Sequence, residues 1–185
     1  MKRRAFKEQI NKILQALEHC RQTQLIEPSL ILLYSGIDIM ASLDRATNHN
    51  YVTRNDFCNW VNTYLLSTCD IHCTDLELYA ARCGVVHSYS PRSRLSDIGE
   101  VRQIAYSHGS GSVEKLQKAL DIGGHSLKIV AINLDDLIEA FKKAIIKFLK
   151  ELPIESEREN IFLERADKFF YTISLTDLEA YLGSR

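Results

Sequence analysis

The sequence predicts a mainly α-helical protein, a four- to five-helix bundle with a small β insertion and extra C-terminal helices. Three observations support this prediction. Apolar residues recur at three- and four-residue spacing in most segments, as in helices that bury one stripe. Two segments have the form of helix-capping boxes, which mark helix starts. Only two short runs are rich in β-branched residues, so the strand content should be small.

The first two predicted helices lie on either side of Pro28. The apolar stripe of the first helix ends before this proline and consists of Phe6, Ile10, Ile13, Leu14 and Leu17. The next run, SLILLYSGIDIMASL, is apolar on almost all sides, which is typical of a helix buried in the core. We expect this helix to begin at Ser29 and to end near Leu43, before a loop with the sequence ATNHN.

Two capping boxes predict the starts of the third and fourth helices. Thr53 with Asp56 resembles the pattern loosely, and Thr74 with Glu77 fits Thr-x-x-Glu, in which side chain and backbone satisfy each other's free groups. The fourth helix must end before Pro91, because the residue before a proline disfavours helical geometry. One face of the third helix carries Phe57, Trp60, Val61, Tyr64 and Leu65.

The second half of the chain predicts a small sheet and further helices. VRQIAYS and SLKIVAI have the composition of strands, with a short helix, VEKLQKAL, and glycine-rich turns between them. An amphipathic helix follows, capped by Asn133 and ending before Pro153, with Leu134, Leu137, Ile138, Phe141, Ile145 and Phe148 facing inward. One more helix over about 157–170 and a short terminal helix complete the chain.

The 185 residues fit one domain with a sizeable core. Within a single domain over 1–185, we predict that 1–95 and 133–151 form the helical core. The segment 96–132 would be the β-containing insertion, and 153–185 the C-terminal helices.

Composition narrows the classes of function. The formal net charge of −1 gives no overall attraction to nucleic acid or membrane, so any such attraction must be local. No apolar run approaches the roughly 20 residues that span a bilayer, and the amphipathic start MKRRAFKEQINKIL is unlike a signal peptide. We therefore expect a cytoplasmic protein without a membrane partner. The five cysteines are odd in number, which favours reduced thiols over disulfides.

The segment RCGVVHSY holds three side chains suited to phosphate chemistry, Arg82, His87 and Tyr89. Arginine is a permanent cation with a planar set of donors, histidine titrates near neutral pH, and tyrosine offers a hydroxyl and a stacking face. In RNA cleavage, the histidine would take the proton of the ribose 2′-hydroxyl, and the arginine would stabilise the charge on the phosphorane. This chemistry needs no metal and no cofactor.

Helix geometry restricts how Arg82 and His87 can cooperate. On a straight helix the two residues lie roughly 140° apart, so one chain does not easily direct both at one point. We expect either a bend at Gly84 or a site shared by two subunits. The alternative to a catalytic role is a structural one, in which a histidine near a helix C-terminus interacts with the helix dipole and the free carbonyls.

The sequence RCGVVHSY resembles the Arg-x4-His-x-Tyr signature of the HEPN superfamily, the higher eukaryotes and prokaryotes nucleotide-binding domain. The family's helical core would cover roughly residues 5–150. The resemblance implies a homodimer whose two motifs face a shared cleft, often a metal-independent ribonuclease in toxin–antitoxin, phage-defence or RNA-processing systems. It implies that Arg82 and His87 are the catalytic pair.

The resemblance also assigns roles to two further residues. Tyr89 matches the tyrosine that a minimal nucleotidyltransferase antitoxin adenylylates in some members. Asp38 matches a polar residue on the buried second helix that supports the site. A carboxylate there needs a partner, which would be Arg82 or His87, or instead a local hydroxyl such as Ser35 or Ser42. Cys83 departs from the polar amide of many members, and a catalytically silent nucleotide- or protein-binding module is therefore the alternative function.

Two further features have competing interpretations. Arg92, Arg94 and Arg102 follow the motif and could form a positive rim for RNA, with salt-dependent binding. Alternatively, they lie in a solvated loop whose charge is offset by Asp97 and Glu100.

Histidines and cysteines at i, i+3 and i+4 spacing in CDIHC, with Cys83 and His87 further on, could hold zinc. Buried or turn cysteines are the favoured alternative, so we predict no metal.

Overall fold

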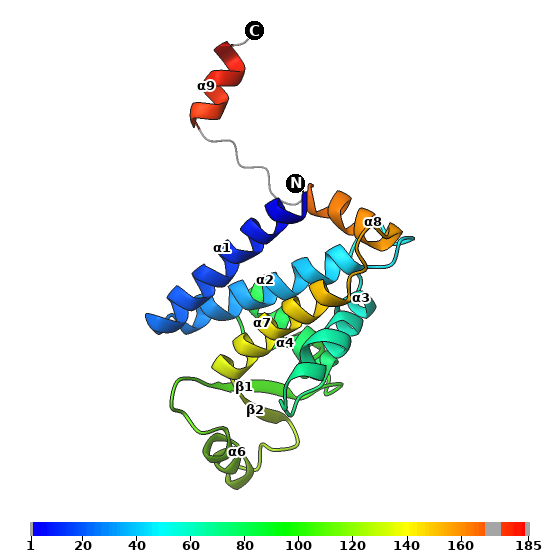
Figure 1. Ribbon diagram of the computed structural model, residues 1–185. Coiled ribbons are helices and arrows are strands. Elements are labelled where there is room, and N and C mark those ends of the chain that lie inside the picture. Colours follow the sequence, from blue (N-terminus) through cyan, green and yellow to red (C-terminus); the bar gives the residue numbers. More distant parts are fainter. Residues whose placement is uncertain (1, 169–174, 184–185) are drawn as a thin grey trace.

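A computed structural model describes residues 2–168 and 175–183 of the chain. This part is mainly helical, as predicted, and Figure 1 shows the arrangement of its elements. The helices are α1 (Lys2–Gln22), α2 (Ile26–Asp44), α3 (Arg54–Trp60), α4 (Asp75–Ser88), α5 (Arg94–Asp97), α6 (Val113–Ile122), α7 (Leu134–Glu151), α8 (Glu157–Ala166) and α9 (Leu175–Gly183). The strands are β1 (Gln103–Ser107) and β2 (Ile129–Asn133). A π-helical turn (Val61–Leu65) and a 3-10 turn (Leu66–Thr68) follow α3 directly.

The core is built around α2, which packs against α1, α3, α4, α7 and α8. A methyl group at Gly36 would lie 2.7 Å from Cζ of Phe141 on α7, so the absence of a side chain lets these two helices approach. Contrary to the sequence expectation, α2 is long and apolar enough to cross a membrane, but half of its most apolar stretch is buried inside the protein. Buried core helices of globular proteins can have the same length and composition.

The second helix begins three residues earlier than predicted, at Ile26 instead of Ser29. Pro28 therefore lies in the first turn of α2. In that turn the missing N–H of proline removes no hydrogen bond, and its fixed φ suits the helix. The Ser29 side chain is buried and donates to the carbonyl of Leu25. The sequence predicts a helix boundary at Pro28, whereas this residue lies inside the second helix.

Both predicted capping boxes are present. At the start of α3, Thr53 accepts from the backbone of Asp56, whose carboxylate accepts from the backbone of Thr53. At the start of α4, Thr74 and Glu77 exchange the same two bonds. The carboxylate of Asp56 also accepts from Nδ1 of His49, at 2.9 Å. These carboxylates anchor the loops that precede the two helices.

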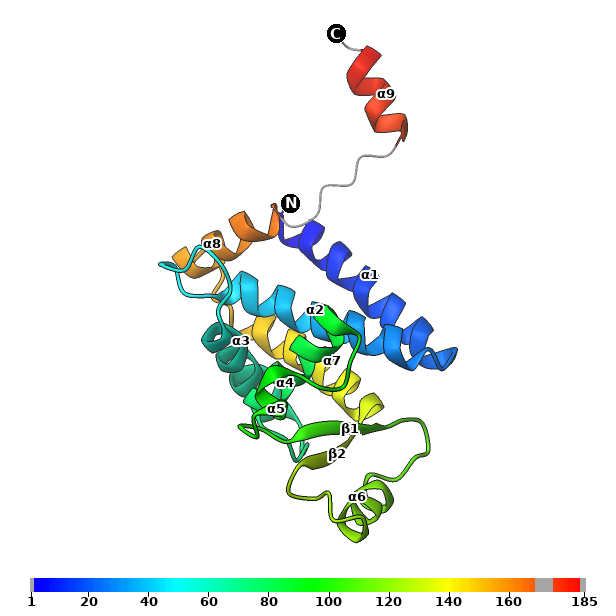
Figure 2. The ribbon, with the colours of Figure 1, turned by 180° about the vertical axis from the view of Figure 1, so that it is seen from behind.

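The β element is a two-stranded parallel sheet in which Gln103 pairs with Ile129 and Ser107 with Asn133. Parallel strands need a crossover connection, and α6 provides it (Figure 2). The insertion predicted over 96–132 thus has the expected composition of two strands and a short helix. β2 continues one residue further, to Asn133, which also caps α7 by accepting from the backbone of Asp135 and Asp136.

A pair of tyrosines joins the sheet to the bundle. The hydroxyls of Tyr34 on α2 and Tyr106 on β1 share a hydrogen bond. Burial raises the pKa of both phenols well above the usual range. Each buried hydroxyl has the other as its hydrogen-bond partner inside the protein.

The C-terminal helices are α8 and α9. α8 was expected to reach about residue 170 but ends at Ala166; residues 169 and 170 lie outside the described part of the chain. α8 packs against the ends of α1 and α2, and Phe162 on it contacts Phe6 on α1. The predicted short terminal helix is α9, which stands apart from the other helices in both views (Figures 1 and 2).

Candidate active site

Arg82 and His87 meet within one chain. Both belong to α4, an uninterrupted α-helix from Asp75 to Ser88, and Nη1 of Arg82 lies 2.9 Å from Nε2 of His87. The arginine side chain is long enough to reach across the helix surface. The contact therefore requires neither a bend at Gly84 nor a second subunit. A site shared between two subunits stays a prediction.

Asp38 on α2 holds the other side of the guanidinium. Its Oδ2 accepts from Nε of Arg82 at 2.7 Å and also from Nη2. Arg82 is thus the partner of this carboxylate, as one of the predicted alternatives has it. The side chains of Asp38 and Arg82 are 20% and 17% exposed, so the ion pair is mostly shielded from water. Asp38, Arg82 and His87, hereafter the triad, form one chain of hydrogen bonds between α2 and α4.

The electrostatics of the triad follow from its partial burial. Removal from water raises the pKa of the Asp38 carboxyl, and the hydrogen bond and charge of Arg82 oppose this change without reversing it. Arginine only donates, so the contact with His87 is a hydrogen bond only when Nε2 carries no proton. His87 is itself exposed at the end of α4. The arrangement thus presents an acceptor nitrogen and a cation at the protein surface.

Cys83 and Tyr79 lie beside the guanidinium, and sequence reasoning missed Tyr79. The Cys83 thiol is 3.9 Å from Nη1 of Arg82. It also contacts the Tyr79 hydroxyl, whose pKa is raised by burial and by this thiol. The i, i+4 spacing of residues 79 and 83 places them on one face of a helix and could have indicated the pair.

The turn after α4 positions Tyr89. This residue adopts the left-handed conformation with φ 48° and ends the helix, and its side chain is 65% exposed. The chain then folds back so tightly that a methyl group on Gly84 would lie 2.5 Å from the carbonyl oxygen of Arg92. Gly84 is therefore needed so that the turn can approach α4 closely. Tyr89, the last residue of the motif, is exposed to solvent.

The three rim arginines do not gather around His87. Arg92 pairs with Asp97 at 2.8 Å, as the solvated-loop interpretation expects. Arg102 forms an ion pair with the buried Glu77 at 2.6 Å, near the start of α4, about 15 Å along the helix from His87. Both arginines line a cavity of about 1030 Å³ that His87 does not line. Arg94 is exposed and, unlike the other two, forms no ion pair within the described residues.

The structure offers no support for the zinc interpretation. All five cysteines are free thiols. Across residues 2–168 and 175–183, no three His, Cys, Asp or Glu side chains lie close enough together to hold a metal ion. Burial, followed by nearby Glu77, raises the pKa of Cys73 to about 12, as expected for a largely buried thiol.

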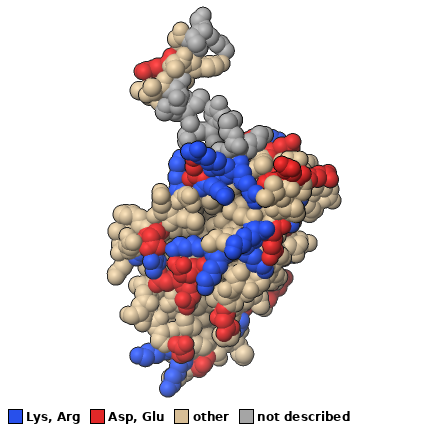
Figure 3. Space-filling model, in the orientation of Figure 1, with Lys and Arg blue, Asp and Glu red and all other residues tan. Residues whose placement is uncertain are grey.

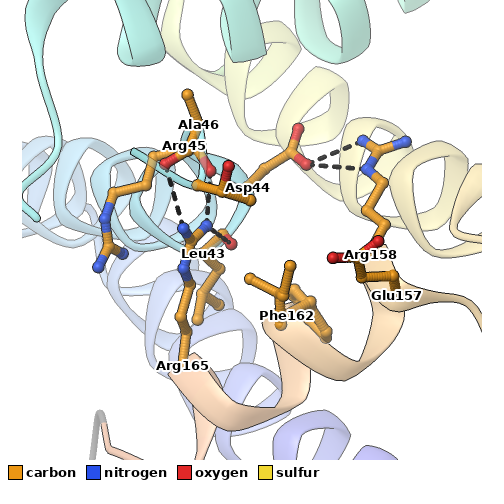
Figure 4. A pocket seen from close by; sticks show the side chains of 10 residues that line it. Leu43, Asp44, Arg45, Ala46, Glu157, Arg158, Phe162 and Arg165 are labelled. Carbon is orange, nitrogen blue, oxygen red and sulfur yellow. Dashed lines mark hydrogen bonds and ion pairs between the residues drawn. The ribbon is translucent and has the colours of Figure 1, made fainter. Parts of the chain in front are cut away.

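A second polar pocket, which sequence reasoning missed, lies between the end of α2 and α8 (Figure 4). Arg165 donates to the carbonyls of Leu43, Arg45 and Ala46, and Arg158 binds Asp44 at 2.8 Å. Helix ends leave free carbonyls, and α2 has no glycine at its end to satisfy them. The absence of such a glycine could have indicated that side chains from another element cap the end of α2. These arginines fasten α8 to the bundle.

The triad is the site with the clearest chemical capacity in the described structure. It combines a cation that suits phosphate, an imidazole nitrogen that can accept a proton, and a carboxylate that fixes the cation. The chain matches no known protein-family model, no curated protein and no solved structure.

Proposed function

We propose that the protein is a metal-independent endoribonuclease of the HEPN type, with the triad as its catalytic centre. The observation that carries this proposal is the contact of Arg82 with both Asp38 and His87. It brings an acceptor nitrogen and a fixed cation within one hydrogen bond of each other. The mainly helical bundle, with the motif late in its fourth helix, agrees with the resemblance.

In the proposed reaction, Nε2 of His87 takes the proton of a ribose 2′-hydroxyl. The resulting oxygen attacks the adjacent phosphorus while the bond to the 5′-oxygen breaks. The leaving 5′-oxygen takes a proton from water, and His87 then returns its proton to the solvent. Arg82 stabilises the negative charge of the phosphorane, and Asp38 keeps the guanidinium in place. The products are a 2′,3′-cyclic phosphate and a 5′-hydroxyl.

The proposal extends to the setting of the enzyme. The protein would act in the cytoplasm as a homodimer with the two motifs facing a shared cleft, as a toxin or as a defence or RNA-processing component. The exposed position of Tyr89 suits a residue that positions RNA or that a minimal nucleotidyltransferase antitoxin modifies. Arg94 is the remaining candidate for the RNA rim.

One observation favours the second candidate function, a catalytically silent nucleotide- or protein-binding module. Nη1 of Arg82 covers the nitrogen of His87 that a general base must use. In an active enzyme, a bound phosphate must replace His87 as the partner of Nη1. This exchange frees Nε2 for the 2′-hydroxyl, while Asp38 still holds Nε and Nη2 of Arg82. In a silent module the contact persists.

The test is RNA cleavage by the purified protein in EDTA, with Arg82→Ala and His87→Ala and with His19→Ala, an exposed histidine on α1, as a matched control. We expect cleavage by wild type and by the control, with cyclic phosphate ends. Loss of the general base should slow the reaction by about 10²- to 10⁴-fold. RNA cut equally by wild type and both site variants would exclude the site. No cleavage, with RNA binding that depends on Arg82, would favour the silent module.

A further inference from the structure

An apolar groove lies between α1 and α7, away from the triad. Its volume is about 740 Å³. Ile146 and Ile154 in its lining are 54% and 75% exposed, so apolar surface faces solvent. The basic residues among its lining are Arg3, Lys7, Lys142 and Lys150. Figure 3 shows Lys and Arg side chains in two groups on the upper half of the drawn face, with uncharged surface between them.

α9 has the opposite character. Leu175, Leu178 and Leu182 follow the i, i+3, i+7 spacing of one helix face, and they are 71%, 39% and 62% exposed, with Tyr181 56% exposed next to them. The sequence of α9 contains two acidic residues and no basic residue, and Glu179 is exposed. A short helix with its apolar stripe in solvent is a typical ligand for a hydrophobic groove.

Length and charge match the helix to the groove. The nine residues of α9 form a helix about 14 Å long. The α1 residues of the groove, from Arg3 to Leu14, extend over about 16 Å. An acidic helix with an apolar stripe thus matches an apolar groove of similar length. Arg3 and Lys142 already pair with carboxylates of their own chain, so Lys7 and Lys150 provide the positive charge of the rim.

We propose that the α1–α7 groove is the docking site for α9 of a second copy of this chain. In both ribbon views α9 lies apart from the other helices, and its exposed leucines can contact another chain. Exchange of identical elements between copies fills both grooves of a pair and is a low-cost route to a dimer.

Carbodiimide cross-linking of full-length protein tests this docking, because the reagent joins the carboxylate of Glu179 to a lysine amine of the groove. The protein is prepared with ¹⁴N and with ¹⁵N, and the two preparations are mixed before the reaction. Mass spectrometry then separates links within a chain from links between chains. The proposed function also supposes a homodimer, so a dimer alone would not distinguish the two proposals. The measurement therefore follows the cross-links of α9 and not the oligomeric state.

We expect mixed-isotope peptides that join Glu179 to Lys7 or Lys150. Leu178→Gln and Ile146→Gln, both changes at exposed positions, should lower their yield by about tenfold below saturation. Leu127→Gln, at a site 92% exposed outside the groove, should not. If Glu179 is linked only to lysines of its own chain, the occupant of the groove is not a second copy. Absence of the links, or yields unchanged by Leu178→Gln and Ile146→Gln, would overturn the groove as the docking site. None of these outcomes depends on RNA cleavage.

Discussion

Asp38 is the residue that gives Arg82 a fixed orientation. Two donors of the guanidinium are bound by one carboxylate oxygen, and a third faces His87. Without this anchor, a side chain with several rotatable bonds would sample many positions around the imidazole. Asp38 is therefore a positioning residue, which acts on a phosphate only through Arg82.

Asp38→Asn should lower both stability and RNA cleavage. A hydrogen bond to a charged group contributes about 1.5–3 kcal/mol, so we expect the free energy of unfolding to fall by about 2 kcal/mol. Displacement of Arg82 should reduce kcat by roughly 10- to 100-fold. Urea unfolding and single-turnover cleavage check the two effects.

Asp97→Asn is the matched control, because the Asp97–Arg92 pair is exposed and exposed pairs contribute about 0–1 kcal/mol. Equal losses of stability in the two variants would contradict the distinction between the two ion pairs. A normal kcat in Asp38→Asn would contradict the positioning role.

The sequence indicates Arg82 as one of the candidate partners of Asp38, but it does not indicate the partner of Arg102. A carboxylate amid an apolar run demands a partner, and the motif supplied one that the structure bears out. Arg102 instead binds Glu77, 25 positions earlier in the chain. That pairing depends on where the chain enters β1 relative to α4, which no local pattern encodes. The contact of Arg82 with His87 was missed because the 140° estimate followed backbone directions and ignored side-chain reach.

At the level of elements, the start of α3 depends on one buried carboxylate. Asp56 receives hydrogen bonds from the side chain and backbone of Thr53, from His49 and from the backbone of Ala46. Burial raises the pKa of Asp56, but these bonds outweigh it and lower the pKa to about 2. A carboxyl whose pKa is lower in the folded protein stabilises the fold above its unfolded pKa.

Asp56→Asn should therefore cost stability in a pH-dependent way. The lowered pKa corresponds to about 2 kcal/mol at neutral pH. This contribution should be lost as pH falls from about 4 towards 2. Urea unfolding of wild type and variant at pH 7 and at pH 3 measures the difference. A difference that grows as the pH is lowered would contradict the assigned direction.

Elements with local signals were the most predictable. Both capping boxes depend on residues three positions apart, and both are present. The π-helical turn at Val61–Leu65 was not foreseen, because its apolar residues fit an ordinary helical stripe as well. The start of α2 was misplaced for a related reason: proline permits both a helix boundary and a first turn.

Across the whole molecule, burial is concentrated in α2 and α7. α7 alone buries eight residues: Leu134, Leu137, Ile138, Ala140, Phe141, Ala144, Ile145 and Phe148. α6 buries none, and the side chain of Gln117 ties it to the backbone of Ala131 in β2. Stability should therefore differ strongly between the bundle and the crossover helix.

Hydrogen exchange should reveal this difference. We expect amides in α6 to open with free energies at least about 2 kcal/mol below those in α2 and α7, because local opening of α6 exposes little apolar surface. Exchange measured by mass spectrometry at several pH values checks the order. Equal protection of α6 and α2 would show that the insertion unfolds only with the bundle.

The Tyr34–Tyr106 hydrogen bond couples two positions 72 residues apart. Phenylalanine at either position alone leaves a buried hydroxyl without its partner, whereas phenylalanine at both removes the polar pair altogether. Natural selection should therefore disfavour the single replacements and tolerate the double one. In related chains, we expect residues 34 and 106 to covary, so that β1 shares an evolutionary history with the central helix α2.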